Sequence, residues 1–598
     1  MADGTTSALQ AASPCPTCGG RADGLPPCDD CVARHGHPAR WQVPRLRSLW
    51  DDDEEFCLVE AKVTRRGLAE LLAVGGATTY AVFKAPRALL ALRARIPTAQ
   101  LISVGPEADD DCATIGEALA VAGPEATVVV SEGTYRESLL VRNGVFLKAA
   151  RGRRVEIAPP DGPAITVIGG DPVIQGLVLR AAPHADLDLP APVVLVTGGS
   201  PVVRNCEVWF AGSDGIVVQG TGTSARVEST KVHGGDRPSR DSGRVRAAVR
   251  FDRGTTGTVE KCTLAPSGDT WIGVHVDPGA APIVRETKVI TTSGGTGLNV
   301  WGGRGTFDRC VVEARVGMSV QENGQPFVHQ TSFTGCAVGL DVAGPNGGTY
   351  EACTFEGWSP AVKLRASASP VFDGCTVTAR GSGVVMGEGA DPLFRRTPVH
   401  SLMGEAVVAE VGARGLFDQC DVGKVAEGGS EPWQMDPKVA AVSLGKRAST
   451  QFVGCTIAFG PGPGVAVAPS GGGTFEDCQI HGHVGPGMTV GLDAHPLVRG
   501  GLIARNGGDG VRVLEGGRGT FKGCTIDGNR ASGLHLEARA DPVVRDCQVT
   551  GNGEHGVVVG DGAIGRITGC TFDRNASGDW LVGPGARAQL LGNARNPA

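Results

Sequence analysis

A repeat of 23 residues near the C-terminus constrains the fold of this chain more than any other feature. Cys524, Cys547 and Cys570 are each 23 residues apart, and an apolar residue stands three positions before each of them. An Asn follows each Cys by five positions, and we expect these Asn residues to line a corner. A fixed period with several short alternating segments is typical of a β-solenoid, whose units bury their apolar faces only by stacking.

The same register can be followed back along the chain, with a residue three positions earlier that is apolar throughout. The residue just before the Cys-like position is often Gly, Asn or Asp, which suits a tight corner with φ > 0. We therefore expect three short strands per coil, an internal apolar and aromatic stack, and cysteines buried as packing groups. The Cys-like positions are Leu177, Cys206, Thr230, Cys262, Thr287, Cys310, Thr331, Cys353, Cys375, Thr397, Cys420, Cys455, Cys478, Gly501, Cys524, Cys547 and Cys570.

Two CxxC pairs near the N-terminus predict a metal site. With a gap of nine residues between the pairs, the four cysteines are Cys15, Cys18, Cys28 and Cys31. Four thiolates in this pattern suit one tetrahedral structural zinc ion, and the pattern resembles a short zinc ribbon. A redox pair is the alternative, although no thioredoxin-like context surrounds it. His35 and His37 could replace a Cys ligand, but we expect exposed linker histidines. Residues 1–40 are thus predicted to form a zinc knuckle.

The next part of the chain, residues 41–104, has the pattern of a small α/β module. Strand-like runs alternate with a segment at 64–74 that has helical spacing of its leucines. Nothing in this module assigns it a function.

The stretch that follows resembles the leading cap and first coils of right-handed parallel β-helix proteins. The matching motifs are Thr114-Ile115, Glu117-Ala-Leu119 and Gly133-Thr-Tyr135-x-Glu137. The resemblance implies a short capping helix within residues 105–125, and a cover of this kind protects the exposed edge of the first coil. The β-helix itself is predicted to occupy residues 126–598.

The coils themselves resemble the β-helix repeats of carbohydrate-binding proteins, sugar hydrolases and lyases, and of the β-helical substrate-recognition part of an F-box ubiquitin-ligase subunit. The resemblance runs from about Leu101 to the C-terminus and rests on the Cys, apolar and corner positions described above. It implies an all-β, right-handed parallel β-helix with coils of about 23 residues. It does not imply one activity, because this fold hosts many.

Charge and hydropathy limit the partners and the compartment. The chain has 56 Lys and Arg against 63 Asp and Glu, a net charge of −7, which does not favour nucleic acid as a partner. No apolar run approaches the ~18 residues of a membrane span, and the opening MADGTTSALQ lacks the features of a secretory signal. We expect a cytoplasmic protein without a membrane partner, in which the cysteines are reduced.

Three coils are longer than the rest and point to a candidate binding face. Their insertions, at 181–192, 233–246 and 423–438, all fall between the Cys strand and the Gly-Val-x-Val strand. Long loops beside a rigid sheet are a usual place for binding. The sheet that they border should present a row of outward polar residues, with two Trp at its margins that could stack on sugar rings. This predicted patch comprises Arg250, His275, Asn299, Ser319, Asp341, Lys363, Trp271 and Trp301; an ordinary solvated face is the alternative.

No complete catalytic set is recognisable in the predicted patch. Glycoside hydrolysis needs two carboxylates ~5–10 Å apart, and only Asp341 lies in the row, with Asp277 at its edge. The motifs of polygalacturonases are absent, and no Asp cluster accompanies an Arg base as in pectate lyases. We therefore assign no catalytic residue and predict a recognition or scaffold protein for a protein partner or an extended glycan. A polysaccharide-active hydrolase or lyase is the alternative.

Overall fold

The computed structural model of the protein describes residues 100–182, 191–235, 246–267, 271–291, 294–424 and 436–595. The chain divides into two units, Met1–Thr98 and Ala99–Ala598, and the described residues all belong to the second. The predicted zinc knuckle lies outside the described residues, and so does the predicted α/β module up to residue 99.

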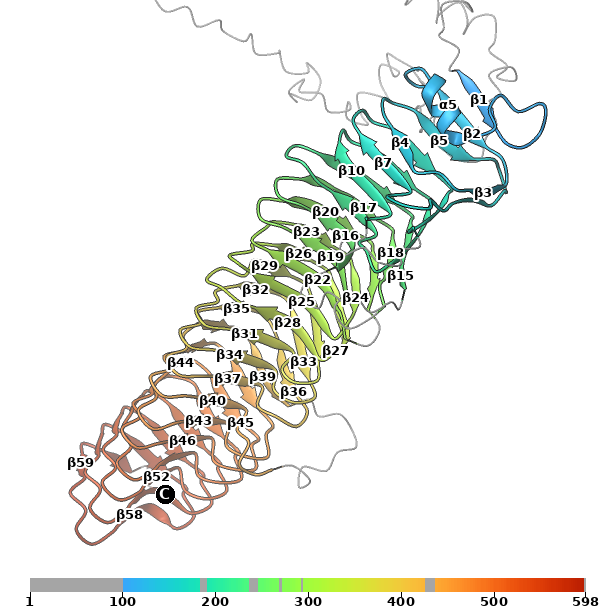
Figure 1. The fold of residues 1–598 in the computed structure, drawn as a ribbon. Coiled ribbons are helices and arrows are strands. Elements are labelled where there is room, and N and C mark those ends of the chain that lie inside the picture. The colour runs from blue at the N-terminus through green and yellow to red at the C-terminus, as the bar shows by residue number, and fades with distance from the viewer. Residues whose placement is uncertain are drawn as a thin grey trace, which may run out of the picture. The chain divides into compact units, whose positions relative to one another are not determined.

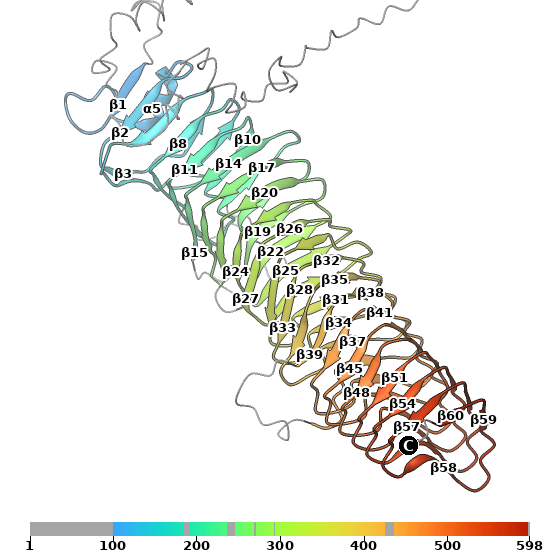
Figure 2. The ribbon, with the colours of Figure 1, turned by 180° about the vertical axis from the view of Figure 1, so that it is seen from behind.

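The second unit is a right-handed parallel β-helix, which confirms the predicted fold class (Figure 1). Each coil gives one strand to each of three parallel sheets, which contain 21, 20 and 19 strands within the described ranges. We call them sheets A, B and C; one coil contributes β11 (Val202–Arg204) to A, β12 (Glu207–Ala211) to B and β13 (Ile216–Val218) to C. The view from behind in Figure 2 shows the same stack of coils.

The N-terminal end of the β-helix is covered by a short helix. Strand β1 (Leu101–Val104) pairs with β2 (Thr127–Val130), so the last four residues of the predicted α/β module belong to sheet A. Helix α5 (Ile115–Val121) begins at a capping box and buries Ile115 in the core. The N–H of Ile115 donates a hydrogen bond to the Glu137 carboxylate at 3.0 Å, which fastens the helix to the first coil. Only seven residues long, α5 cannot cross a membrane, and no other described helix can.

The predicted internal stack is present in sheet A. Six aromatic rings on successive coils lie face to face, with centroids 4.4–5.0 Å apart: Tyr350, Phe372, Phe394, Phe417, Phe452 and Phe475. This spacing follows from the ~4.8 Å between neighbouring strands. The described cysteines are all free, and all but Cys112 are buried, as predicted for packing groups.

The corner before the Cys-like position has left-handed backbone geometry whatever residue occupies it. The φ angles are 52° at Asn205, 53° at Lys261, 55° at Asp546 and 65° at Gly523. This confirms the predicted corners and shows that the stack of coils imposes the conformation, since Lys adopts φ > 0 far less readily than Gly.

A ladder of buried Asn side chains lines another corner, as expected. The Nδ2 of each Asn donates to the Oδ1 of the next one at 2.8–3.1 Å, through Asn506, Asn529, Asn552 and Asn575. The coil before Asn506 carries His483 at this position, and the His483 N–H donates to Asn506 Oδ1 at 3.2 Å. The ladder thus satisfies polar groups that the coils bury.

Candidate functional site

Six residues of the predicted patch form one continuous row on the outer face of sheet C. Parallel pairing aligns them in the predicted order, Arg250, His275, Asn299, Ser319, Asp341 and Lys363. The strands that carry them are β16 (Arg246–Phe251), β19 (Trp271–Val276), β22 (Thr296–Trp301), β25 (Val316–Gln321), β28 (Val338–Val342) and β31 (Val362–Leu364). Neighbours in the row lie about one strand spacing apart, ~4.8 Å.

The centre of this row is buried, so the prediction of an exposed face is wrong there. His275, Asn299 and Ser319 are only 5%, 6% and 8% exposed. Two side-chain contacts accompany this burial: Asn299 Nδ2 lies 3.1 Å from His275 Nδ1 on the preceding coil, and the Gln321 amide donates to Ser319 Oγ on the same strand at 2.9 Å. With the amide in this orientation, His275 Nδ1 accepts and the ring carries its proton on Nε2.

Asp341 is held by an arginine from the next coil. Arg365 donates to both carboxylate oxygens of Asp341, at 2.8 and 2.6 Å. This bidentate contact raises the pKa of Arg365. Asp341 is therefore the anion of an ion pair and not a free acid or base, while Lys363 beside it is exposed.

A pair of carboxyl groups that the sequence analysis did not recognise stands at the edge of sheet C. Asp252 and Asp277 directly follow β16 and β19, whose register aligns Phe251 with Val276. Burial raises the pKa of Asp252, and a hydrogen bond with Asp277 adds to this effect against the charge of Arg250. Burial opposes the ionisation of Asp277, but the hydrogen bond from His275 outweighs it and lowers the pKa. The pKa values of the two carboxyl groups are therefore shifted in opposite directions, and Asp252 is the weaker acid of the pair.

The carboxyl pair continues into the buried row through His275. The ring Nε2 of His275 lies 3.0 Å from Asp277 Oδ1, so the chain of contacts runs from Asp252 through Asp277 and His275 to Asn299. A signal for the pair exists in the sequence, because Arg250-Phe-Asp252 and His275-Val-Asp277 place an Asp two positions after each row residue. The alternation of strand directions puts these residues on the same face.

The two tryptophans of the predicted patch have different environments. Trp271 is buried against Phe210, with ring centroids 5.0 Å apart, so it is a core residue and the prediction that it could stack on a ligand is wrong. Trp301 is 40% exposed and ends β22, where the register places it next to Asp277 on one side and Gln321 on the other. We call Asp252, Asp277, Trp301 and Gln321 the edge row.

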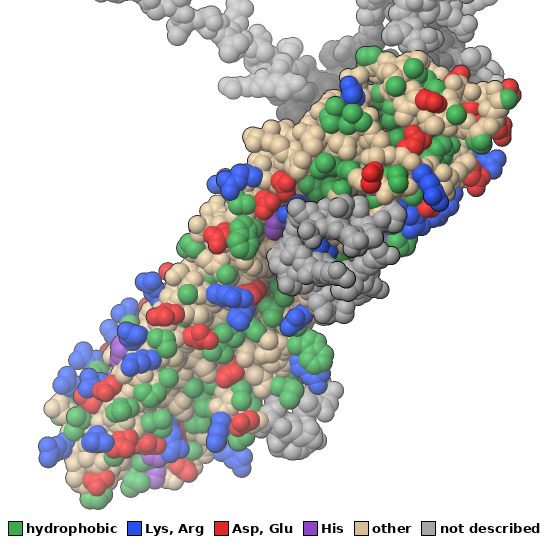
Figure 3. All heavy atoms as spheres, in the orientation of Figure 1, with side chains coloured by type: hydrophobic (Ala, Val, Ile, Leu, Met, Phe, Trp, Pro, Cys, Tyr) green, Lys and Arg blue, Asp and Glu red, His purple; other side chains and the backbone are tan. Residues whose placement is uncertain are grey.

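The predicted insertions lie where the sequence analysis placed them, between a strand of sheet B and the next strand of sheet C. The flanking strands are β9 (Val178–Arg180) and β10 (Val194–Gly198), β15 (Lys231–Gly235) and β16, and β39 (Asp421–Lys424) and β40 (Val442–Leu444). The central residues of the insertions are outside the described ranges. On the face seen in Figure 3, positive and negative side chains are intermixed along the coils.

No metal site accompanies the edge row. Within the described part of the chain, no group of three or more His, Cys, Asp or Glu side chains could hold a metal ion. The predicted zinc ligands Cys15, Cys18, Cys28 and Cys31 fall outside that part.

Comparisons with known proteins agree with the fold. The profile of a family described as "Right handed beta helix region" matches residues 247–397, 296–434 and 440–594. No curated protein is significantly similar in sequence.

Similar solved structures include pectin methylesterase PemA from Erwinia chrysanthemi, at 15% identity over 38% of this chain and 81% of that chain, with a TM-score of 0.28. Pectate lyase Pel9A has 13% identity over 49% of this chain and 79% of its own, with a TM-score of 0.34. A chain of the Vag8–C1 inhibitor complex has 15% identity over 78% and 99%, with a TM-score of 0.35. At these identities the similarities concern the fold alone.

Proposed function

The chain belongs to the right-handed β-helix family, and from this premise we propose that it is a recognition protein that binds an extended glycan along the outer face of sheet C. Membership of the family leaves the activity open, because the fold hosts many functions. The proposal therefore depends on the side chains that sheet C presents.

The observation that carries the proposal is the exposed ring of Trp301 between two polar neighbours. An indole offers a flat apolar surface, and a sugar ring can lie on it with its hydroxyl groups directed sideways. Asp277 and Gln321, one coil away on either side, provide acceptors and a donor for such hydroxyls. A glycan that runs along the stack would meet these groups in turn, at intervals of ~4.8 Å.

Recognition is favoured over catalysis by the geometry of the carboxylates. Two-carboxylate glycoside hydrolysis needs the acids ~5–10 Å apart, whereas Asp252 and Asp277 are hydrogen bonded to each other. Asp341 is occupied by Arg365. The edge row therefore contains polar contacts suited to binding, without a separated acid–base pair.

A binding measurement tests this proposal. Trp301→Ala should weaken binding of soluble polysaccharides, measured by affinity electrophoresis and calorimetry, by about 2- to 10-fold, the equivalent of ~0.5–1.5 kcal/mol for an aromatic contact. Trp358→Ala is the matched control, because Trp358 is also exposed but follows β30 (Thr354–Gly357), away from the edge row. Equal losses in both variants, or no glycan bound by the wild type, would contradict the proposal.

The second candidate function is a polysaccharide-active enzyme, and the divergent pKa values of Asp252 and Asp277 favour it. Adjacent carboxyl groups whose environments shift their pKa values in opposite directions can supply an acid and a base. Depolymerisation by the wild type that disappears in Asp277→Asn and persists in Asp341→Asn would replace the recognition function with this one.

We propose a structural zinc ion for the N-terminal cysteines and a cytoplasmic location. Four thiolates at the CxxC spacing support the zinc ion. The free state of the described cysteines is what a reducing compartment favours.

A further inference from the structure

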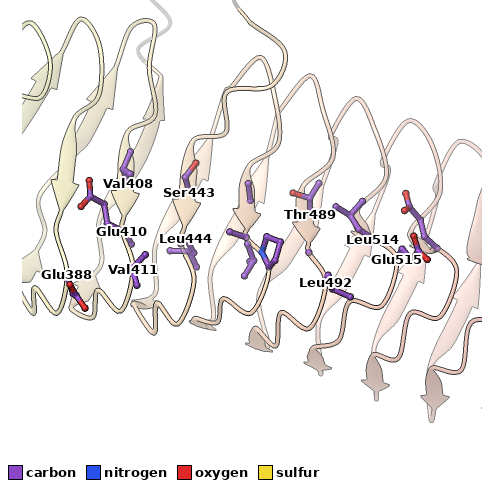
Figure 4. A pocket seen from close by; sticks show the side chains of 18 of the residues that line it. Glu388, Val408, Glu410, Val411, Ser443, Leu444, Thr489, Leu492, Leu514 and Glu515 are labelled. Atoms are coloured by element: carbon purple, nitrogen blue, oxygen red, sulfur yellow. The ribbon is translucent and has the colours of Figure 1, made fainter.

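A trough crosses the outer face of sheet C on coils that follow the edge row in the sequence. Its volume is about 1050 Å³, and its lining extends over seven coils, from Glu388 to Arg539. The strands of sheet C below it are β34 (Val384–Met386), β37 (Val407–Ala409), β40 (Val442–Leu444), β43 (Val465–Val467), β46 (Met488–Val490), β49 (Val511–Val513) and β52 (Leu534–Leu536). Figure 4 shows lining side chains on one coil after another.

The trough is hollow because the outward residues at its centre are small. Along the row, Ser443, Ala466 and Thr489 stand between the larger Val408 and Arg512. The residues that directly follow the same strands are also small at the centre: Gly445, Ala468 and Gly491. The recess thus lies where these two neighbouring rows lack bulk on three successive coils.

The surface of the trough is aliphatic. Exposed or half-buried apolar side chains line it, namely Val408, Val411, Ala466, Ala468, Pro469, Leu492 and Leu514, and none of the lining residues is aromatic. Contact with aliphatic groups of a ligand would remove this surface from water. A sugar ring would find no aromatic platform here, in contrast to Trp301 in the edge row.

Carboxylates stand at both ends of the trough, but only one pair is neutralised. At the end nearer the C-terminus, Glu537 binds Arg512 at 2.9 Å and Glu515 binds Arg539. At the other end, neither Glu388 nor Glu410 is ion-paired to any residue that the structure describes, and both are exposed. Figure 4 shows these two side chains on neighbouring coils. The trough therefore has a negative end and a neutral end.

We propose that the trough is a docking site for an extended polypeptide segment of a partner protein. The segment carries Lys or Arg over Glu388 and Glu410 and small aliphatic side chains over the centre. The negative charges of Glu388 and Glu410 determine which end of the partner segment is cationic, since carboxylates bind ammonium and guanidinium groups by charge-assisted hydrogen bonds. This site is separate from the edge row and does not depend on the glycan-binding proposal.

The length of the trough defines the length of its occupant. Successive strand pairs connect the coil of Glu388 with that of Glu537 in six steps. At ~4.8 Å per coil this is ~29 Å, which an extended peptide of about nine residues spans at ~3.3 Å per residue.

A labelled synthetic peptide, Lys-Ala-Lys-Ala-Val-Ala-Val-Ala-Val, presents both Lys and the Val side chains on one face and tests the proposal by fluorescence anisotropy with the full chain. It should bind, and its affinity should fall as salt screens the Lys–Glu attraction. Two matched peptides, Glu-Ala-Glu-Ala-Val-Ala-Val-Ala-Val and Lys-Gly-Lys-Gly-Ser-Gly-Ser-Gly-Ser, should not bind, because the first reverses the charge and the second removes the aliphatic contacts.

Variants of the protein locate the peptide. Glu388→Lys with Glu410→Lys should weaken binding by about 10-fold or more, since hydrogen bonds to charged groups are lost. Glu107→Lys with Asp109→Lys makes the same change in net charge at exposed positions before α5 and should leave binding intact. Ala466→Trp should fill the trough and abolish binding, while thermal melts confirm that each variant is folded. Trp301→Ala should have no effect, which separates this site from the edge row.

Several results would overturn the proposal. One is an equal loss in the two charge variants, which would indicate non-specific attraction; another is unchanged binding in Ala466→Trp. Binding of a neutral polysaccharide that only Ala466→Trp blocks would make the trough a glycan site. A dimer in sedimentation experiments that only Ala466→Trp dissociates would show that a second copy of the chain occupies it.

Discussion

His483 is a buried histidine at a position where the next four coils carry Asn. Its ring Nε2 lies 3.0 Å from the carbonyl oxygen of Ile457. Burial lowers the pKa of His483 from 6.5 to about 4, with a smaller opposing effect of the Ile457 contact. The ring therefore remains neutral in the folded protein at pH values where it is protonated in the unfolded chain.

This difference predicts a stability change with pH. Between pH 6.5 and about 4, the unfolded chain binds a proton at His483 that the folded protein does not. Stability should then fall as the pH decreases through this window, by up to ~1.4 kcal/mol per pH unit from this residue. His483→Asn should remove this part of the pH dependence, because Asn does not titrate and can continue the ladder from Asn506.

Urea denaturation above, within and below the window measures the effect. His495→Asn is the control, since His495 is exposed and should leave the pH dependence of stability unchanged. The same slope of stability against pH in His483→Asn and the wild type would show that another group is responsible.

At the scale of the element, the strands of sheet A depend on their aromatic stack. Phe475 is fully buried, and its ring centroid lies 5.0 Å from that of Phe452. Phe475→Ala should lower the free energy of unfolding by ~3–5 kcal/mol, the usual effect of removing a buried Phe. Thr525→Ala, at a half-buried outward position of β51 (Thr525–Asp527), should change it by less than ~0.5 kcal/mol.

Denaturant melts compare the two variants, and amide hydrogen exchange shows whether the loss is confined to the coils around Phe475. Comparable losses in both variants would contradict the inward and outward assignment of the strands. Neighbouring coils form most contacts of a solenoid, so we expect the effect on exchange to be local.

The strands could be predicted because each coil repeats the same local constraints. An apolar residue three positions before the Cys, as in Phe475 and Cys478, defines the inward face, and the corner residue defines the turn. These signals lie within one coil, so they can be recognised from the sequence without knowing which residues meet between coils. The order of Arg250, His275 and Asn299 along sheet C follows from the same period.

The environment of the site could not be predicted, because most of it depends on contacts that form only when the coils are stacked. The sequence indicates that His275 points outward but not that Asn299 and Asp277 satisfy both ring nitrogens and leave it buried. It does not distinguish Trp271, at the start of a strand and packed on Phe210, from the exposed Trp301 at the end of the next one. The same holds for the trough, where three small residues from separate coils are adjacent only after stacking.

At the scale of the whole molecule, the two units of the chain are predicted to have different sources of stability. The β-helix is held by its buried core, whereas the N-terminal cysteines should hold a metal ion.

Purified full-length protein should contain about one zinc per chain, because four thiolates form a closed tetrahedral site. Elemental analysis should find this zinc lost in Cys15→Ser with Cys28→Ser. It should be retained in Cys112→Ser, whose cysteine belongs to the β-helix. Wild-type protein that contains no zinc by elemental analysis would contradict the prediction.

The regular stacking of coils places equivalent residues of sheet C ~4.8 Å apart, whereas the groups of an extended ligand repeat at a different distance. An extended peptide repeats the side chains of one face every ~6.7 Å, so three of its repeats match four coils, at ~19–20 Å. A bound peptide with a cation at Glu410 therefore next places a side chain of the same face directly over an equivalent coil position at Leu514, four coils further on. Because the two spacings differ, peptide side chains and coil positions coincide at only a few places along the sheet. A row of identical residues would therefore contact such a ligand well at only some of its positions. A row of different residues can instead select a ligand by its length and by the positions of its side chains.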